Sequence, residues 1–179
     1  CEIPPFDNRD VIAGQGTIAF ELVFQNPKVN TIIVPLSGGG LASGVAVAAK
    51  SKNPYIQIIG VTMEDGAVMH QSLSVGKPID LEEKPSLADA LGGGIGPNNQ
   101  YTFQLCRDYL SESVTVSEAE IYHAMQAMYY EERIIMEGSC AVTAAALMSG
   151  KIKNRKGPIV LVVTGRNVDM NLFTDVIMG

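Results

Sequence analysis

The stretch Val34–Leu41 reads VPLSGGGL and joins a short apolar run to a segment of small residues. The run Thr31–Val34 is apolar and β-branched, which predicts a buried strand. The segment Leu41–Lys50 (LASGVAVAAK) predicts a helix of small residues. Three successive glycines between a strand and a helix allow the backbone to approach a ligand closely and to adopt positive φ.

This junction predicts a phosphate site built from backbone alone, because a helix start presents free N–H groups and the positive end of its dipole. Two nucleotide-binding motifs do not fit. A Walker A loop needs a lysine where Val45 stands, and a Rossmann fingerprint needs a glycine where Ser43 stands. The alternative is a turn that only packs the helix onto the sheet. We disfavour it, because three glycines cost backbone entropy and are expected to add no packing contacts.

On either side of this loop the chain alternates between helix and strand patterns. The expected helices are residues 11–26, 41–50, 67–75, 99–110, 118–133 and 140–149, and the expected strands are 31–34, 57–62, 114–116 and 159–163. Ser117 and Glu120 fit a capping box at the start of a helix. The pattern predicts a single α/β domain over residues 1–179, an open and mainly parallel sheet with helices on both faces in a three-layer sandwich. Such sheets bind ligands at the carboxyl ends of their strands.

Composition excludes several classes of protein. The chain has 179 residues, of which 46% are hydrophobic and 18% charged, so it is neither disordered nor collagen-like. A net charge of −6 without a basic stripe argues against nucleic acid and anionic membranes as partners. Cys1, Cys106 and Cys140 form no disulfide or zinc pattern, and the start of the chain has no signal-peptide pattern. We therefore expect a cytoplasmic protein.

Further motifs carry a family resemblance. They are Ala13–Thr17 (AGQGT), Ala88–Leu91 (ADAL), Gly94–Gly96 (GIG), Glu137–Ser139 (EGS) and Thr164–Asp169 (TGRNVD). Together with the loop Ser37–Leu41, called the glycine loop below, and in this order, they resemble the pyridoxal-phosphate-dependent threonine dehydratases and serine racemases. These are fold type II enzymes related to the tryptophan synthase β subunit. The resemblance covers nearly the whole chain. It implies the C-terminal, large-domain portion of a longer two-domain enzyme.

A narrower resemblance connects the chain with hydroxyectoine-utilisation dehydratases. It is carried by Pro4–Asp7 (PPFD), by Ser37–Gly44 (SGGGLASG) and by Gly92–Gly96 (GGGIG).

The resemblance implies a set of cofactor-binding residues. Those that hold the cofactor phosphate are Ser37, Gly38, Gly39, Gly40 and Leu41. Thr164 would face the pyridine nitrogen, where a neutral hydroxyl favours expulsion of a β-leaving group over a long-lived carbanion. Glu137 would lie beside the cofactor ring, although an acidic residue also favours a helix N-terminus. Asp89 and Ala90 would approach the substrate and the far side of the cofactor, although a loop aspartate can also be a cap. Glu137 and Asp89 are the candidate catalytic residues.

Two departures from the family pattern accompany these matches. Some relatives bind a divalent cation where this chain has Thr62 and Val68; Glu64 and Asp65 are out of register, so we expect a solvated turn and no metal. The family's Schiff-base lysine has no matching motif here. The lysines, none of which is nominated, are Lys28, Lys50, Lys52, Lys77, Lys84, Lys151, Lys153 and Lys156. We expect the Schiff-base lysine in an N-terminal portion of the same enzyme.

The resemblance thus implies a pyridoxal 5'-phosphate-dependent dehydratase, or ammonia-lyase. It would eliminate the β-hydroxyl of a threonine- or serine-type amino acid and yield a 2-keto acid and ammonia. Racemisation or β-replacement on the same scaffold is an alternative, and a non-catalytic binding or assembly module is another. The enzyme is expected to form a homodimer or a higher homo-oligomer. The isolated chain is expected to be inactive, to bind the cofactor weakly and to self-associate.

Overall fold

The computed structural model describes residues 4–153, 155 and 157–179, so that Cys1 and Lys156 lie outside the described residues. The described part of the chain forms one four-stranded sheet, in which the strand order is β3-β2-β1-β4 and all neighbours are parallel. The strands are β1 (Thr31–Pro35), β2 (Gln57–Met63), β3 (Glu112–Val116) and β4 (Ile159–Leu161).

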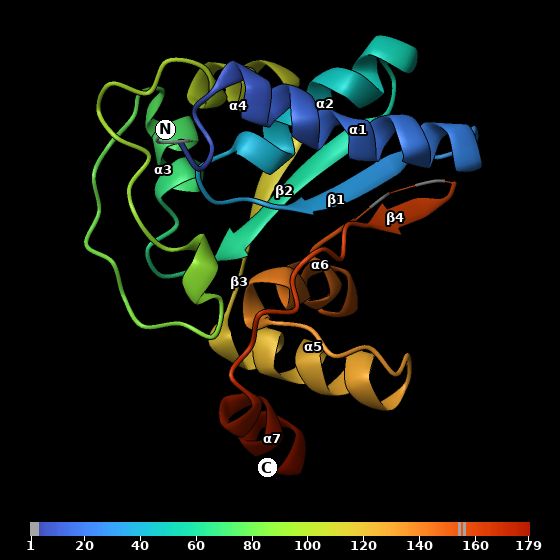
Figure 1. Ribbon diagram of the computed structural model, residues 1–179, viewed down its shortest axis with the longest axis vertical. Coiled ribbons are helices and arrows are strands. Elements are labelled where there is room, and N and C mark those ends of the chain that lie inside the picture. The colour runs from blue at the N-terminus through green and yellow to red at the C-terminus, as the bar shows by residue number, and fades with distance from the viewer. Residues whose placement is uncertain (1–3, 154, 156) are drawn as a thin grey trace.

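Helices cover both faces of this sheet (Figure 1). They are α1 (Arg9–Gln25), α2 (Gly40–Lys52), α3 (Val68–Val75), the 3-10 helix η1 (Asp89–Leu91), α4 (Thr102–Tyr109), α5 (Glu118–Tyr130), α6 (Gly138–Met148) and α7 (Met170–Met178). In Figure 1, α1, α2 and α4 lie above the sheet, α5 and α6 lie below it, and α7 packs beyond α5. The predicted three-layer α/β architecture is confirmed. Within the described residues, no helix combines the length and apolar character that crossing a bilayer requires.

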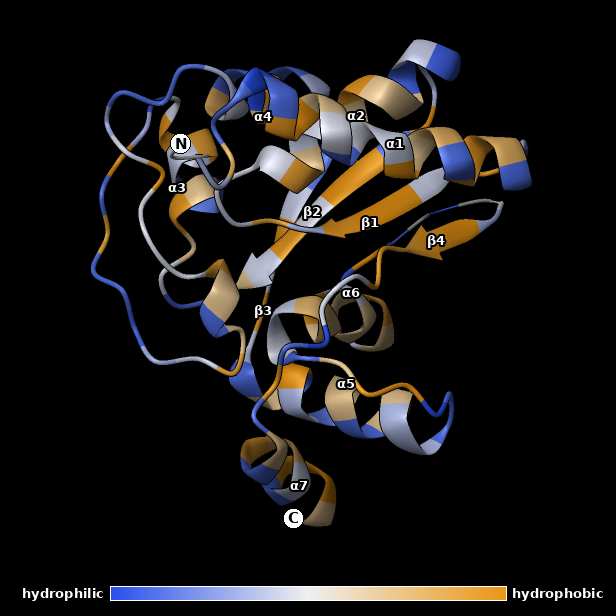
Figure 2. Cartoon of the chain, viewed as in Figure 1, coloured by the Kyte–Doolittle hydropathy of each residue, from blue (hydrophilic) through white to orange (hydrophobic). Residues whose placement is uncertain are grey.

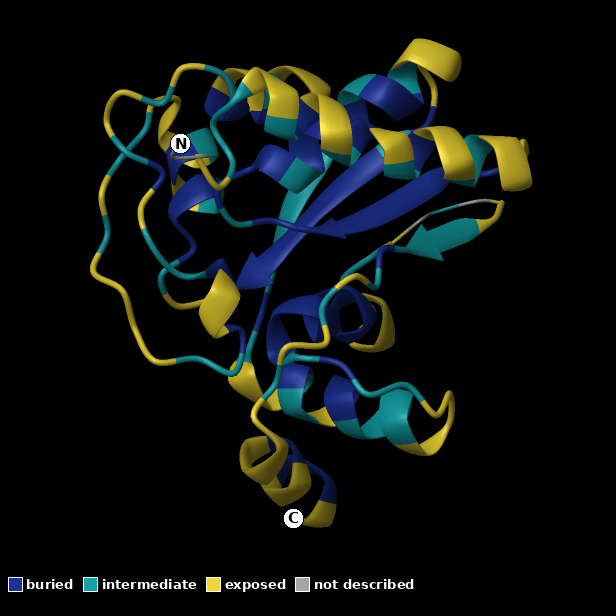
Figure 3. Ribbon diagram, in the orientation of Figure 1, coloured by how far each residue is buried: buried dark blue, intermediate teal, exposed yellow. Residues whose placement is uncertain are grey.

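The central strand β1 explains why the strand runs are apolar throughout. Its side chains alternate between the two faces. Ile32 and Val34 belong to the apolar cluster under α2, whereas Ile33 belongs to the cluster over α6, and all three are fully buried. Figure 2 shows the hydrophobic character of β1 and β2, and Figure 3 shows that both are buried. A strand that is covered on both faces has no solvent side that a polar residue could occupy.

Glycines bring α1 and α2 into close contact. A Cβ on Gly16 would lie 3.2 Å from the carbonyl oxygen of Gly44 and 3.3 Å from Cβ of Ala48. A Cβ on Gly44 would meet the carbonyl oxygen of Ile12 and would lie 2.9 Å from Cβ of Gln15. Gly16 of the AGQGT motif therefore permits close helix packing.

The last strand is shorter than the predicted strand over 159–163. The N–H of Val162 still donates to the carbonyl of Ile33 at 2.9 Å. In a parallel ladder the next bond would run from the residue at position 35 back to Val162, but Pro35 has no N–H. The carbonyl oxygen of Val162 instead lies 3.9 Å from the thiol of Cys140. Because Pro35 cannot donate this bond, β4 ends early, and the loop that carries Thr164 begins.

Some helix boundaries and one whole helix also depart from prediction. The helix predicted over 118–133 ends at Tyr130, because Arg133 adopts a φ of 61° and the N–H of Ile134 donates to the carbonyl of Met128 at 3.0 Å. A residue in the left-handed conformation is a common feature of the end of a helix. Helix α7 was not predicted, although Asp169 caps it by accepting from the N–H of Leu172 at 3.0 Å. The predicted capping box of Ser117 and Glu120 is confirmed.

Candidate functional site

The loops that follow β1 and β4 leave the same edge of the sheet. These strands are adjacent and parallel, with Ile33 paired to Leu161. The glycine loop begins just beyond Pro35, and Thr164 follows β4 by three residues. The structure therefore brings the predicted phosphate loop and the predicted pyridine partner to neighbouring strand ends, where ligand sites of parallel sheets form.

The glycine loop offers a set of unpaired backbone donors. Gly38, Gly39 and Gly40 are buried, and Gly39 is the N-cap of α2 with a φ of 89° and no side-chain cap. Within the described residues, no acceptor is found for the N–H groups of Gly38, Gly39, Gly40 or Leu41. Buried N–H groups without partners are costly, whereas an anion at a helix N-terminus satisfies them. The loop therefore fits the phosphate of pyridoxal phosphate.

The same glycines are tightly packed from outside the loop. A Cβ on Gly38 would overlap the ring of Phe6, and one on Gly40 would lie 2.9 Å from Cα of Phe6. A Cβ on Gly39 would lie 3.0 Å from Sγ of Cys106 and 3.1 Å from Cβ of Thr102. The expectation that these glycines add no packing contacts was wrong. Packing explains why side chains are absent here, but it leaves the four N–H groups without acceptors.

Glu137 forms hydrogen bonds with the loop that carries Thr164. It stands at the N-cap position of α6, yet its side chain makes no cap hydrogen bond there. Instead its Oε2 accepts from the N–H of Asn167 at 2.8 Å, and its own N–H donates to the carbonyl of Gly165 at 3.2 Å. Thr164 itself is exposed. Glu137 therefore lies at a helix start, as one interpretation expects, and its placement beside the cofactor ring stays a prediction.

Asp89 and Ala90 lie in η1 and are exposed. The carboxylate of Asp89 accepts from the N–H of Ala90 at 2.7 Å, which is a local turn contact. The same N–H lies 3.0 Å from the hydroxyl of Ser139, in the EGS motif. A Cβ on Gly138 would collide with the carbonyl group of Leu87. The ADAL and EGS motifs, separated in sequence, are therefore in direct contact.

Lys151, one of the eight lysines of the chain, is already paired with two carboxylates. Lys151 Nζ lies 2.7 Å from Glu120, 3.3 Å from Glu64 and 2.9 Å from the carbonyl oxygen of Thr115. Burial acts to lower the pKa of Lys151, but its hydrogen bonds with the two carboxylates outweigh this and raise the pKa. A Schiff base requires a neutral amine, so this ammonium is unsuited to that role.

The two acidic residues near the family's cation site also have lysine partners. Glu64 pairs with Lys151, and Asp65 lies 3.3 Å from Lys84. Thr62 and Val68 are buried in the core. Over the described ranges, no group of three or more His, Cys, Asp or Glu side chains is arranged to hold a metal ion.

Several residues of the site were missed from the sequence. Phe6 lies on the glycine loop, Asn167 anchors Glu137, and Ser139 contacts Ala90. Asp7 accepts hydrogen bonds from residues more than 90 positions away in the chain. A local pattern gives no signal for contacts of this range. Only the PPFD stretch, noted for its resemblance, drew attention to Phe6 and Asp7.

Comparison with known proteins agrees with this geometry. The family described as "Pyridoxal-phosphate dependent enzyme" matches residues 2–165. The chain is 50% identical over 177 residues to a protein of Sinorhizobium fredii provisionally named a threonine dehydratase, covering 99% of this chain and 53% of that protein. It is 38% identical over 175 residues to the L-threonine ammonia-lyase of Thermotoga maritima, covering 98% of this chain and 43% of that protein.

Among solved structures, maize serine racemase superposes with a TM-score of 0.89 at 35% identity, covering 98% of this chain and 54% of the racemase. The chain thus spans about half the length of the relatives it matches. The resemblance predicted from the motifs is confirmed, and the chain belongs to the family of pyridoxal-phosphate dependent enzymes.

Proposed function

We propose that the complete protein that carries this chain is a dehydratase, or ammonia-lyase, that acts on a hydroxy amino acid of the threonine or serine type. The observation that carries the proposal is the buried glycine loop with its unpaired N–H groups, set beside the neutral Thr164 at the neighbouring strand end. Relatives named for threonine dehydration or deamination support the substrate class, at 38% to 50% identity.

Each part of the site has a role in this proposal. Pyridoxal phosphate, when bound, supplies the electron sink for loss of the Cα proton and the β-hydroxyl. The loop from Ser37 to Leu41 binds its phosphate through backbone N–H groups and the α2 dipole. Thr164 forms a hydrogen bond with the pyridine nitrogen without protonating it. Glu137 orients the Thr164 loop through Asn167, and the segment of Asp89 and Ala90 faces the substrate.

The chain is proposed to be the C-terminal, large-domain portion of this enzyme, with the Schiff-base lysine in the N-terminal portion. Reduction of the complete holoenzyme with borohydride, followed by peptide mapping, is expected to place the cofactor on a lysine outside residues 1–179. Cofactor trapped on any lysine of this chain would contradict the proposal. Release of keto acid by the same preparation distinguishes an enzyme from a non-catalytic module of the same fold.

Replacing Thr164 with Asp is expected to slow elimination by roughly 100-fold while the cofactor stays bound. A carboxylate would hold a proton on the ring nitrogen and stabilise a carbanion instead of favouring loss of the leaving group. Thr164→Ser keeps the hydroxyl and is the matched control. Keto-acid release measures turnover, and cofactor absorbance measures occupancy. An unchanged turnover number in Thr164→Asp would show that this residue does not face the ring.

Racemisation is the second candidate, because maize serine racemase superposes with a TM-score of 0.89 at 35% identity. Formation of the D-amino acid from L-serine by the complete protein, measured beside keto-acid release, distinguishes the two activities. The O-acetyl serine sulfhydrylase structure, at 18% identity, shares the fold alone and adds no support for β-replacement.

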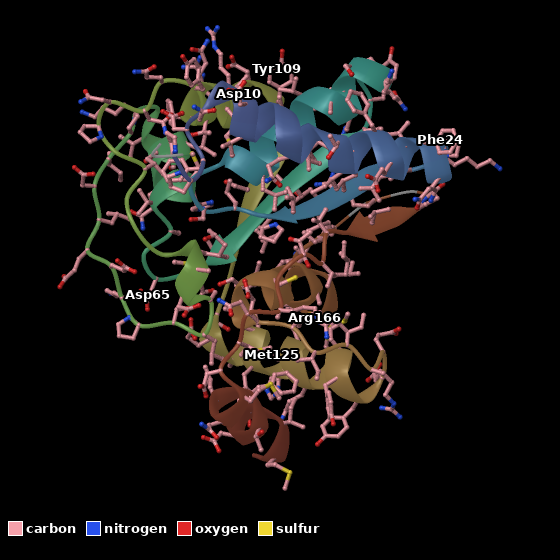
Figure 4. All side chains as sticks on the ribbon, viewed as in Figure 1. Asp10, Phe24, Asp65, Tyr109, Met125 and Arg166 are labelled. Carbon is pink, nitrogen blue, oxygen red and sulfur yellow. The ribbon has the colours of Figure 1, made fainter. Side chains whose placement is uncertain are left out.

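The protein is also proposed to be a cytoplasmic homodimer or higher homo-oligomer. Phe20 and Phe24 on α1 have 47% and 87% of their surface exposed, and Figure 4 shows Phe24 at the outer end of that helix. Exposed apolar side chains of this size support association. Cys106 and Cys140 are free and buried, which supports a reducing compartment. Light scattering on the complete protein measures its oligomeric state.

A further inference from the structure

One carboxylate caps the start of α4 from far away in the chain. The backbone N–H of Gln100 donates to Oδ2 of Asp7 at 2.6 Å, and those of Tyr101 and Thr102 donate to Oδ1 at 2.9 Å each. Helix α4 has no side-chain cap from its own N-cap residue, Tyr101. Asp7 therefore satisfies donors that a helix start leaves open.

The two segments joined by Asp7 are those that enclose the glycine loop. Phe6, its neighbour in the chain, covers Gly38 and Gly40. Thr102, whose N–H bonds to Asp7, presents its Cβ to Gly39. The loop is thus held from both sides by two segments that Asp7 connects directly, while Asn99 caps α4 locally by accepting from the N–H of Phe103 at 2.8 Å. Its glycines have no side chains with which to fix their own conformation.

We propose that Asp7 is a positioning residue for the phosphate loop, which it fixes by locking Phe6 and the start of α4 around the three glycines. The inference rests on the proposed binding of the cofactor phosphate by this loop. Asp7 does not touch the cofactor in this proposal. It sets the direction of the N–H groups that do, and such groups bind well only when they are held in place.

The electrostatics of Asp7 agree with this role. Burial acts to raise the pKa of its carboxyl, but the N–H groups of Gln100, Thr102 and Tyr101 outweigh this and lower it. Asp7 is therefore ionised at neutral pH. Its charge lies against the positive end of the α4 dipole, which limits its repulsion of a nearby phosphate.

The test compares pyridoxal phosphate with pyridoxal, which lacks the phosphate, as ligands of the complete enzyme. Asp7→Ala is expected to weaken binding of pyridoxal phosphate by about tenfold, because loss of an orienting partner typically costs about 10- to 100-fold in affinity. Binding of pyridoxal should stay within about twofold of the wild type, since it does not use the loop. Asp7→Asn keeps one carbonyl oxygen as an acceptor and should give an intermediate loss.

Two matched variants separate positioning from general stability. Asp10 is exposed at the start of α1, and Asp10→Ala should leave both affinities unchanged (Figure 4). Lys151→Met removes the pairs with Glu64 and Glu120 and should lower the thermal midpoint without changing the ratio of the two affinities.

If both Asp7 variants keep the wild-type ratio of affinities for pyridoxal phosphate and pyridoxal, the role of Asp7 is overturned and the proposed function still stands. Absence of binding, or absence of any preference for pyridoxal phosphate in the wild type, would overturn the phosphate loop and the role of Asp7 together. If Asp7→Ala does not fold, the ratio measured for Asp7→Asn decides.

Discussion

Replacing Ser37 with Asp is expected to weaken binding of pyridoxal phosphate by at least about 100-fold while the protein stays folded. Ser37 is half-buried and precedes the unpaired N–H groups of the glycine loop. A carboxylate there would repel a phosphate dianion a few ångströms away by several kcal/mol, even at an effective dielectric constant of about 20. The same charge near the start of α2 should stabilise that helix by about 0.3–1 kcal/mol, so loss of binding would not result from unfolding.

Ser37→Asn is the matched control, because it has the same shape and no charge. Titration of the apoenzyme by cofactor absorbance, together with thermal unfolding, measures both effects. Equal affinity in the Asp and Asn variants would rule out a phosphate at this loop. Gly39→Asp should also lose the cofactor, but it is a poorer test. Its φ of 89° and the 2.9 Å approach of Met69 Cε mean that any side chain there would destabilise the protein as well.

Replacing Gly138 with Ala is expected to lower the free energy of unfolding by about 3 kcal/mol. The added Cβ would occupy the place of the Leu87 carbonyl group, and a backbone group cannot move aside as a flexible side chain can. Relief requires η1 to shift away from α6, which would also break the contact between Ala90 and Ser139. The thermal midpoint should fall by roughly 6–12 °C, measured by calorimetry on the apoenzyme.

Gly14→Ala makes the same chemical change where the structure offers room. Gly14 lies inside α1, and a Cβ there would have nothing within 4 Å. Because glycine in a helix interior is about 0.5–1 kcal/mol less favourable than alanine, this variant should raise the midpoint. A similar loss of stability in both variants would mean that backbone conformation, and not the contact with Leu87, sets the effect.

Much of the fold was open to prediction because it depends on local patterns. Apolar β-branched runs such as Thr31–Val34 favour strands that are buried on both faces, and their alternation with helix patterns favours a parallel sheet with helices above and below it. The capping box of Ser117 and Glu120 acts over three residues and was identified correctly. The glycine loop was located for a similar reason, since a strand, three glycines and a helix start are contiguous in the chain.

The sequence by itself therefore determined the family, the parallel α/β layers and the position of the glycine loop that is proposed to bind the cofactor phosphate. Tertiary structure alone decided how that loop is held: Asp7 bonds to the start of α4, and Glu137 bonds to Asn167 instead of capping its own helix. It also decided where β4 ends, because Pro35 has no N–H that could donate to this strand, which lies more than 120 residues later in the chain. Local patterns reach a few residues along the chain. These contacts join residues that become neighbours only after the sheet and its helices have packed.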